Sequence, residues 1–483
     1  MLTYDLNDKG KALYKNLYEK IRSDINSGVL CCGEKMPSKR ALANHLGIST
    51  ITVEKAYDQL ISEGYLYALP QKGYYIAKIQ HRNALPAMVQ KSIRIQKNPK
   101  EEEIWFDFSS NMTESNCFPF SIWAKILRET ISVREQELMI HSPCNGVYEL
   151  RLAIAKHLEA FRGMSVDPDQ IVVGAGTEYL YSILTQLIGE DKIYAIENPG
   201  YKKLKTIYEM NRIECKPIPM DEEGICTKEL DRVGADVAHI SPNHHFPTGI
   251  TMPISRRYEL LAWVNEKEGR YIIEDDYDSE FRMNGNPIPT LQSIDAGGKV
   301  VYMNTFSKSL ASTIRISYLV LPEKLANLYY EKLSFLSCTV STFEQYTLAS
   351  FIRQGYFEKH INRMRLYYGR KRKRVLDIIK EHFPPQQCRI MENGSGLHFL
   401  IVLATEVSDQ EIIGKLREKN IKIHSIHDFE MECTNTSHGT FIVNYSNLDE
   451  TKFEEALLIL KEVISGTGEQ EASYQKDKKN TRG

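Results

Sequence analysis

The strongest chemical signal in the sequence is a lysine that follows an apolar run. The run VVYMNT predicts a buried strand, and Lys308 comes shortly after it, within NTFSKSLASTIRISY. A lysine amine forms a Schiff base when its surroundings keep part of it deprotonated. Arg315, seven residues further on, offers a bidentate guanidinium to a phosphate, and Thr305 and Ser307 add hydroxyl donors. Any one of the 61 basic residues is usually a surface residue, and this spacing after a strand is what singles out Lys308.

A second candidate is the glycine turn in IVVGAGTEYLYSIL, which predicts a strand, a turn and the start of a helix. The free backbone amides of Gly176 and Thr177, together with the helix dipole, would suit a phosphate. Glycine turns occur in most α/β folds. By itself, therefore, this segment gives only weak support to a phosphate site.

Acidic and aromatic residues follow further predicted strands. RYIIEDDYD predicts a buried strand whose carboxyl end is Asp275, which could pair with a protonated ring nitrogen. Tyr277 could hydrogen-bond a ring hydroxyl. The same acids could equally be metal ligands or an ordinary polar strand end. The loops ENPGY and SPNHHFPTG also follow strands, where α/β folds place their ligands, and Tyr201 could stack on an aromatic ring.

These segments belong to a region with the pattern of an α/β domain, predicted to span residues 105–465. Short apolar runs alternate there with amphipathic helical stretches. The runs are IVVGA, KIYAIE, DVAHIS, RYIIEDD, KVVYMN and SYLVLP. Residues 79–104 are polar and lack periodicity, which predicts a linker, and residues 466–483 are predicted to be a disordered tail.

Residues 8–78 predict a separate DNA-binding module. Apolar residues recur at helical spacing over residues 13–25, Ser38 is a predicted N-cap, and Gly47 makes a turn into another helix. A helix, a tight glycine turn and a second helix place a recognition helix in the major groove. YLYALPQKGYYIAKI then predicts a two-stranded wing. The alternative is a small helical interaction domain whose lysines are merely solvated.

Charge is distributed unevenly along the chain. The first 80 residues contain 11 Lys and Arg against 8 Asp and Glu, whereas the whole chain has a formal net charge of -2. Nucleic-acid binding is therefore expected to be a local property of the amino-terminal end.

Residues 11–78 resemble the winged helix of GntR-type regulators over their whole length. The matching segments are LYEKIRSDINSGVL, GEKMPSKRALANHLGIS and TVEKAYDQLISEGYL. The resemblance implies binding of double-stranded DNA, although many relatives carry Arg where Thr50 stands, so one guanine contact is absent here. The residues that it assigns to DNA contact are Lys39, Arg40, Ser49, Thr50, Thr52, Lys55, Lys72 and Gly73.

From residue 11 to about 465 the chain resembles the MocR/GabR-like regulators. In that family a winged helix-turn-helix is fused to a fold-type I aminotransferase-like domain, with a large α/β part and a smaller carboxyl-terminal α+β part. The resemblance implies a head-to-tail homodimer that holds pyridoxal 5'-phosphate at the subunit interface. It makes Lys308 the Schiff-base lysine, Asp275 the pyridine partner, Tyr277 the ring-hydroxyl donor and Arg315 the phosphate clamp. Gly176, Thr177, Tyr201, Thr305 and Ser307 complete the expected cofactor-binding set.

The chain departs from the family pattern where relatives bind a ligand carboxylate. Relatives that sense amino acids usually clamp the α-carboxylate with an arginine near the carboxyl terminus, and Ile442 occupies that position here. Lys203 stands where some relatives have a second arginine, and His141 where many have a tyrosine. A lysine is only a point charge, so an α-amino acid ligand is less favoured. His141, His438 or Lys203 could bind an anion instead, although a solvated polar residue is the simpler interpretation of each.

Composition narrows the remaining possibilities. No run approaches the roughly 18 apolar residues of a membrane span, and the amino terminus lacks the apolar core of a signal peptide. The nine cysteines include no CxxC pair, so neither a metal site nor a disulfide framework is expected. A reduced cytoplasmic location is the simplest expectation.

Three functions remain open at this point, one of them a cofactor-binding scaffold with no role at DNA. The first is a transcription regulator in which pyridoxal phosphate itself, or an amine or amino acid forming an external aldimine, is the small-molecule effector. The second is an active aminotransferase with an appended DNA-binding module, for which Lys308, Asp275 and Arg315 would permit partial chemistry.

Overall fold

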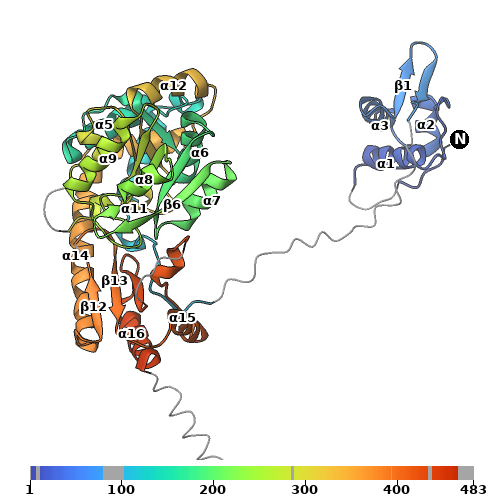
Figure 1. Cartoon of the computed structure of the whole chain (residues 1–483). Coiled ribbons are helices and arrows are strands. Elements are labelled where there is room, and N and C mark those ends of the chain that lie inside the picture. Colours follow the sequence, from blue (N-terminus) through green and yellow to red (C-terminus); the bar gives the residue numbers. More distant parts are fainter. Residues whose placement is uncertain are drawn as a thin grey trace, which may run out of the picture. The chain divides into compact units, whose positions relative to one another are not determined.

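A computed structural model describes residues 2–6, 11–79, 103–283, 288–392, 394–432 and 438–465. The chain forms two compact units, residues 1–100 and 101–483 (Figure 1). The predicted linker, residues 79–104, falls almost wholly outside the described residues, and the predicted tail, residues 466–483, falls entirely outside them.

The amino-terminal unit is a winged helix-turn-helix, as predicted. Ser38 caps its second helix by accepting a hydrogen bond from the Ala41 amide at 3.2 Å. Gly47 ends that helix in the left-handed conformation, with φ of +65°, and so turns the chain into the third helix. The helices are α1 (Leu13–Asn26), α2 (Lys39–Leu46) and α3 (Thr50–Ser62), and the wing strands are β1 (Leu66–Leu69) and β2 (Gly73–Ile76).

One apolar cluster holds this unit together. Leu17 and Ile21 of α1, Leu42 of α2, and Val53 and Leu60 of α3 are all fully buried in it. Leu17 and Ile21 are four residues apart, and Val53 and Leu60 are seven apart, so each pair lies on one face of its helix, as in an amphipathic helix.

The carboxyl-terminal unit is built around an eight-stranded, mostly parallel sheet. Its order is β4-β11-β10-β9-β8-β5-β6-β7, with β11 antiparallel to both neighbours and β7 antiparallel to β6. All six apolar runs predicted as strands are strands of this sheet. The bounds are β4 (Ile171–Gly174), β5 (Ile193–Asn198), β6 (Glu214–Asp221), β7 (Gly224–Ile225), β8 (Val237–Ile240), β9 (Tyr271–Asp275), β10 (Val300–Thr305) and β11 (Ser317–Val320).

Helices cover both faces of this sheet. Val172 and Val301 belong to one apolar cluster, while their neighbours Val173 and Tyr302 belong to another, as the two-residue period of a strand requires. The helices are α4 (Phe120–Val133), α5 (Tyr148–Arg162), α6 (Thr177–Ile188), α7 (Lys202–Met210), α8 (Thr227–Arg232), α9 (Ile254–Glu266), α10 (Leu291–Ile294), α11 (Phe306–Ser309), α12 (Glu323–Leu333) and α13 (Thr342–Arg353). The short 3-10 turns are Ser115–Cys117, Glu137–Met139, Pro168–Gln170 and Ser279–Phe281.

A smaller α+β part completes the carboxyl-terminal unit (Figure 1). Its antiparallel sheet has the order β12-β13-β15, and β3 pairs in parallel with β14. The strand β3 thus joins the start of the unit to a segment more than 300 residues later. The elements are β3 (Phe106–Asp107), α14 (Tyr356–His382), β12 (Cys388–Met391), β13 (His398–Leu403), α15 (Asp409–Glu418), β14 (Ile421–Lys422), a 3-10 turn (Ile426–Phe429), β15 (Thr440–Asn444) and α16 (Glu450–Ser465).

Among the described residues, no helix combines the length and the apolar composition needed to cross a membrane.

Candidate functional site

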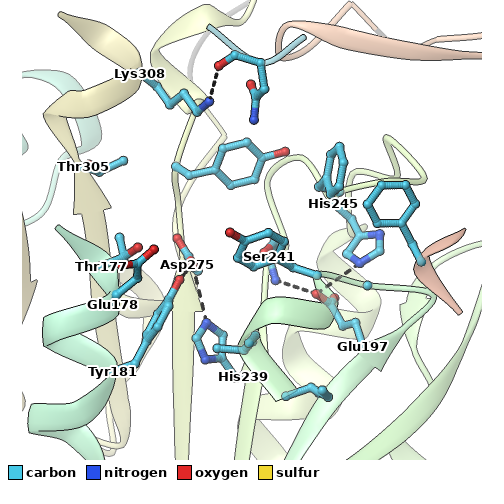
Figure 2. A pocket seen from close by; sticks show the side chains of 18 of the residues that line it. Thr177, Glu178, Tyr181, Glu197, His239, Ser241, His245, Asp275, Thr305 and Lys308 are labelled. Atoms are coloured by element: carbon cyan, nitrogen blue, oxygen red, sulfur yellow. Dashed lines mark hydrogen bonds and ion pairs between the residues drawn. The ribbon is translucent and has the colours of Figure 1, made fainter. Parts of the chain in front are cut away.

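A cavity of about 430 Å³ lies at the carboxyl ends of the parallel strands (Figure 2). Parallel strands bring their carboxyl ends to one edge of the sheet, so residues that are distant in sequence meet there. The smaller part of the unit closes the cavity with Lys422, His424, Phe429 and Met431. Of the predicted cofactor residues, the cavity wall contains Thr177, Tyr201, Asp275, Tyr277, Thr305, Ser307, Lys308 and Arg315.

Lys308 is held on the short helix α11, directly after β10. Its Nζ donates a hydrogen bond to the backbone oxygen of Asn111 at 2.8 Å. Burial lowers the pKa of Lys308 from 10.5 to about 8, while the charge of Asp278 acts in the opposite direction. The amine is therefore partly neutral near physiological pH, which is what attack on a carbonyl carbon requires.

Asp275 ends β9 and is held from two sides. Tyr181 of α6 donates a hydrogen bond to Asp275 Oδ2 at 2.8 Å, and His239 Nε2 of β8 lies 3.6 Å from the same oxygen. The other oxygen, Oδ1, is buried and has no hydrogen-bond partner. A buried acceptor without a partner is costly, so Oδ1 is suited to an N–H group of a bound ring. The sequence analysis did not identify Tyr181 or His239, because no local pattern shows which helix faces a strand end.

The predicted phosphate-binding residues converge at the start of α6. Gly176 precedes the helix with φ of +91°, and a Cβ built there would lie 2.4 Å from Arg315 Nη2. Glycine therefore suits both the positive φ and the close approach of the guanidinium. The Gly176 amide donates to the Gly174 oxygen at 2.9 Å, so the expectation that this amide is free is wrong. Glu178, which the sequence analysis passed over, lies in the same cradle with its Oε2 3.7 Å from Arg315 Nη2.

Glu178 also binds Lys203, which belongs to the first turn of α7. The hydrogen bond from Lys203 lowers the pKa of Glu178, and the pairing raises the pKa of Lys203. Lys203 is therefore paired with a carboxylate and does not stand as a free cation. An anion that approached Lys203 would therefore have to compete with the Glu178 carboxylate.

Three of the other predicted residues line the cavity, and two of them also make hydrogen bonds within the loop that carries Lys308. Ser307 donates to the Ile314 oxygen at 2.9 Å, and Thr305 lies 3.4 Å from the Ile316 oxygen while it caps α11. Both hydroxyls thus stabilise the loop that carries Lys308. Tyr201 lines the cavity with nearly half of its surface exposed.

Tyr277 lies beside a buried cluster of His244, Asp278 and His398. Its hydroxyl is 3.4 Å from His244 Nδ1, which is itself 2.9 Å from Asp278 Oδ2. Ligand atoms of the three cluster residues lie within 4.8 Å of one another, a spacing compatible with a metal ion. His398 Nε2 already lies 3.2 Å from the Pro247 oxygen. The expectation that the chain has no metal site stays a prediction.

Asp276, between Asp275 and Tyr277, organises the loops around the cavity. Its carboxylate accepts hydrogen bonds from Arg162 (2.6 Å), Asn243 (2.8 Å), Ser279 (2.7 Å) and Tyr302 (2.7 Å). The ion pair with Arg162 is almost completely buried on both sides. Helix α5, the loops after β8 and β9, and strand β10 are thereby tied to one carboxylate.

A buried acid near the end of β5 and a buried imidazole in the loop after β8 form part of the cavity wall (Figure 2). Glu197 accepts a hydrogen bond from the Ser241 amide at 2.9 Å, and His245 Nε2 lies 3.4 Å from the same carboxyl oxygen. Burial raises the pKa of Glu197 to about 8 and lowers the pKa of His245 to about 3. Both groups are therefore mainly neutral at pH 7.

The position of the expected carboxylate clamp is apolar. Ile442 is buried in a small cluster with Leu400 and Ile426, against which Phe246 and Phe429 pack. The other two candidate anion ligands, His141 and His438, are exposed and do not line the cavity.

In the amino-terminal unit, the predicted DNA-contact residues differ in their availability. Lys39 Nζ is 2.7 Å from Glu54 and 3.7 Å from Asp58, so it ties α2 to α3. Ser49 caps α3 by accepting from the Thr52 amide at 3.1 Å. Five of the residues predicted to contact DNA are exposed: Arg40, Ser49, Thr50, Lys55 and Lys72. The other three, Lys39, Thr52 and Gly73, are half-buried.

Comparison with known proteins gives the same two-part organisation. Residues 13–76 match the family of bacterial regulatory proteins named gntR, and residues 103–460 match the aminotransferase class I and II family. The HTH-type transcriptional regulator YdeL of Bacillus subtilis is 36% identical over 449 residues, covering 93% of this chain and 96% of its own. The probable rhizopine catabolism regulatory protein MocR of Rhizobium meliloti is 31% identical, covering 86% of each chain.

Solved structures resemble the carboxyl-terminal unit in fold. Kynurenine aminotransferase from Pyrococcus horikoshii superposes with a TM-score of 0.67 at 24% identity, covering 78% of this chain and 97% of that one. The predicted fold-type I aminotransferase fold is thus confirmed.

The lowered pKa of Lys308 predicts an unusual pH dependence of cofactor uptake. Because the neutral amine reacts, the rate at which pyridoxal phosphate is taken up should rise as the pH approaches about 8 and then level off. For an amine with the ordinary pKa of 10.5, the rate of uptake would keep rising until the pH reached about that value. Stopped-flow absorbance of the Schiff base over pH 6–10 tests this, with Lys308→Ala as the control that cannot form it. A rate still rising above pH 9.5 would contradict it.

The Asp276 network predicts a large stability loss on removal of its cation. Arg162→Met leaves a buried carboxylate without its counter-ion, so the free energy of unfolding should fall by about 3–5 kcal/mol. Urea unfolding followed by tryptophan fluorescence reports it, because Trp105, Trp123 and Trp263, the three tryptophans, all lie in the carboxyl-terminal unit. Arg232→Met, at a side chain 75% exposed, is the control and should cost less than about 1 kcal/mol. Equal losses in the two variants would refute the role of the pair.

Proposed function

The chain belongs to the MocR-type regulators, in which a GntR DNA-binding domain precedes an aminotransferase class I and II domain, and from this membership we propose that it controls transcription through the ligand state of Lys308. The GntR domain binds DNA and the second domain binds pyridoxal phosphate. The observation that carries the proposal is a half-buried, partly neutral lysine at a strand end, in a chain that also carries a winged helix.

The cavity residues fit the cofactor in three independent respects. Asp275 Oδ1 offers an unpartnered buried acceptor to the ring nitrogen, and the space kept open by Gly176 admits the Arg315 guanidinium beside the phosphate-binding amides. Lys308 holds the cofactor, and Tyr277 would hydrogen-bond its ring hydroxyl. Pyridoxal phosphate supplies an aldehyde carbon that condenses reversibly with primary amines and releases water.

Regulation requires that the two domains be coupled. A coupling free energy of about 1–3 kcal/mol between cavity and DNA-binding domain changes DNA affinity roughly 5- to 150-fold. In the proposed arrangement the chain acts in the cytoplasm as a head-to-tail homodimer, whose two winged helices meet two half-sites on one duplex. A small molecule in the cavity shifts the spacing of those winged helices.

Replacement of Lys308 separates the two activities. Lys308→Ala should abolish the visible absorbance of the cofactor-loaded protein, because no amine remains to condense with the aldehyde, while DNA binding at low salt persists. Absorbance spectra and fluorescence anisotropy on the protein's own upstream DNA measure both, with Lys299→Ala as a matched lysine control outside the cavity. Unchanged absorbance in the Lys308 variant would refute the assignment. Sustained transamination by the unmodified protein, at about 1 per second or faster, would favour an active enzyme instead.

Replacement of Lys39 and Arg40 tests the DNA-contact helix. Lys39→Ala with Arg40→Ala should weaken duplex binding and reduce the slope of log affinity against log salt by about 1–2, since each phosphate contact contributes about 0.9. Cofactor uptake should not change. Because Lys39 is paired with Glu54, the single Arg40→Ala variant should produce about half or more of the reduction in slope seen in the double variant. An unchanged slope in the double variant would place the contacts elsewhere.

A further inference from the structure

One stretch of the cavity wall, formed by the loop after β8 and by the smaller part of the unit, is apolar and aromatic. Phe246 and Phe429 line the cavity there with their ring centroids 5.0 Å apart, and Met431 also lines the cavity. Behind the two rings, Ile442 is fully buried with Leu400 and Ile426. A ligand group that reaches this wall meets rings and thioether rather than a hydrogen-bond donor, and burial of an apolar group there is favourable.

The basic side chains around the cavity, apart from Lys308, each lie near a carboxylate. Lys203 and Arg315 share Glu178. Lys422 Nζ is 3.6 Å from the Asp107 carboxylate, and His424 Nδ1 is 3.0 Å from that of Asp428. A ligand carboxylate would have to displace one of these partners.

Bound pyridoxal phosphate would engage Lys308 through its aldehyde, and Arg315, which already lies beside Glu178, through its phosphate. What is left to face a ligand includes the carboxyl groups of Glu178 and Glu197, together with the aromatic wall. A ligand anion placed there loses its hydration and meets a lysine, Lys422, only where the Asp107 carboxylate already lies 3.6 Å away, which is unfavourable in a partly enclosed site.

Resting on the proposed function, we propose that the cavity selects a primary amine whose carbon skeleton carries an apolar group and no carboxylate. The amine is directed to the cofactor at Lys308, and the apolar group lies against Phe246, Phe429 and Met431. Ordinary α-amino acids are rejected because their carboxylate finds no free cation.

Matched ligand pairs test this selection directly. The cofactor-loaded, full-length protein is titrated with 2-phenylethylamine against phenylalanine, and with isopentylamine against leucine, pairs that differ only in the carboxylate. Visible absorbance and affinity for the upstream DNA are followed in parallel. We expect each amine to bind at least tenfold more tightly than its amino acid. An amino acid that binds equally well or better overturns the inference.

Two substitutions test the stated cause. Glu178→Gln frees Lys203, so the preference for amine over amino acid should fall severalfold at saturating cofactor, whereas Glu178→Asp keeps the charge and should retain the preference. Ile442→Arg introduces a guanidinium behind the aromatic wall and should lower the preference further, with Ile442→Leu as its apolar control. If Ile442→Arg fails to fold, the comparison of Glu178→Gln with Glu178→Asp still tests the electrostatic explanation. A preference that is unchanged in Glu178→Gln contradicts the electrostatic explanation.

The outcomes also separate this inference from the proposed function. If neither amines nor amino acids alter the absorbance, while Lys308→Ala still abolishes it, the ligand class is wrong and the cofactor assignment stands. If Lys308→Ala leaves the absorbance intact, the proposed function fails, whatever the amines do.

Discussion

The geometry of the cavity depends on one buried carboxylate. Asp276 is flanked by two residues that line the cavity, Asp275 and Tyr277, yet its own side chain is bound to the buried Arg162. Asp276 directly follows β9, so its anchored carboxylate restricts the orientation of the residues on either side of it. The same carboxylate accepts from Asn243 and Tyr302, so the loops after β8 and β9 and the strand β10 share one anchor. A buried ion pair of this kind contributes little net stability, but it leaves the loops only one satisfied arrangement.

Around that anchor, each cavity group derives its behaviour from its surroundings. Burial lowers the pKa of Lys308, and burial raises the pKa of Glu197. Glu178, half-exposed and beside Lys203 and Arg315, stays ionised. The cavity thus combines a partly neutral amine, a mainly neutral acid and a charged acid within one wall, which explains how it can favour an amine over an anion.

The sequence predicted the architecture well and the contacts less well. Helix spacing, the Ser38 cap and the apolar runs identified the winged helix and six strands, because these signals are local. The strand ends at Asp275 and Lys308 were also found, since parallel strands place their carboxyl ends together. Tyr181 and Glu178 were missed because their roles arise from the packing of α6 against the sheet. The pairing of Lys39 with Glu54 was missed for the same reason, as it joins two helices across the turn.

The close fit between Gly176 and Arg315 has an evolutionary consequence. A methyl group at position 176 would meet the guanidinium, and φ of +91° strains any side chain there, so a larger residue displaces Arg315 from the start of α6. A lineage that changes position 176 thereby loses part of the reason to keep arginine at 315, and the two positions are expected to vary together.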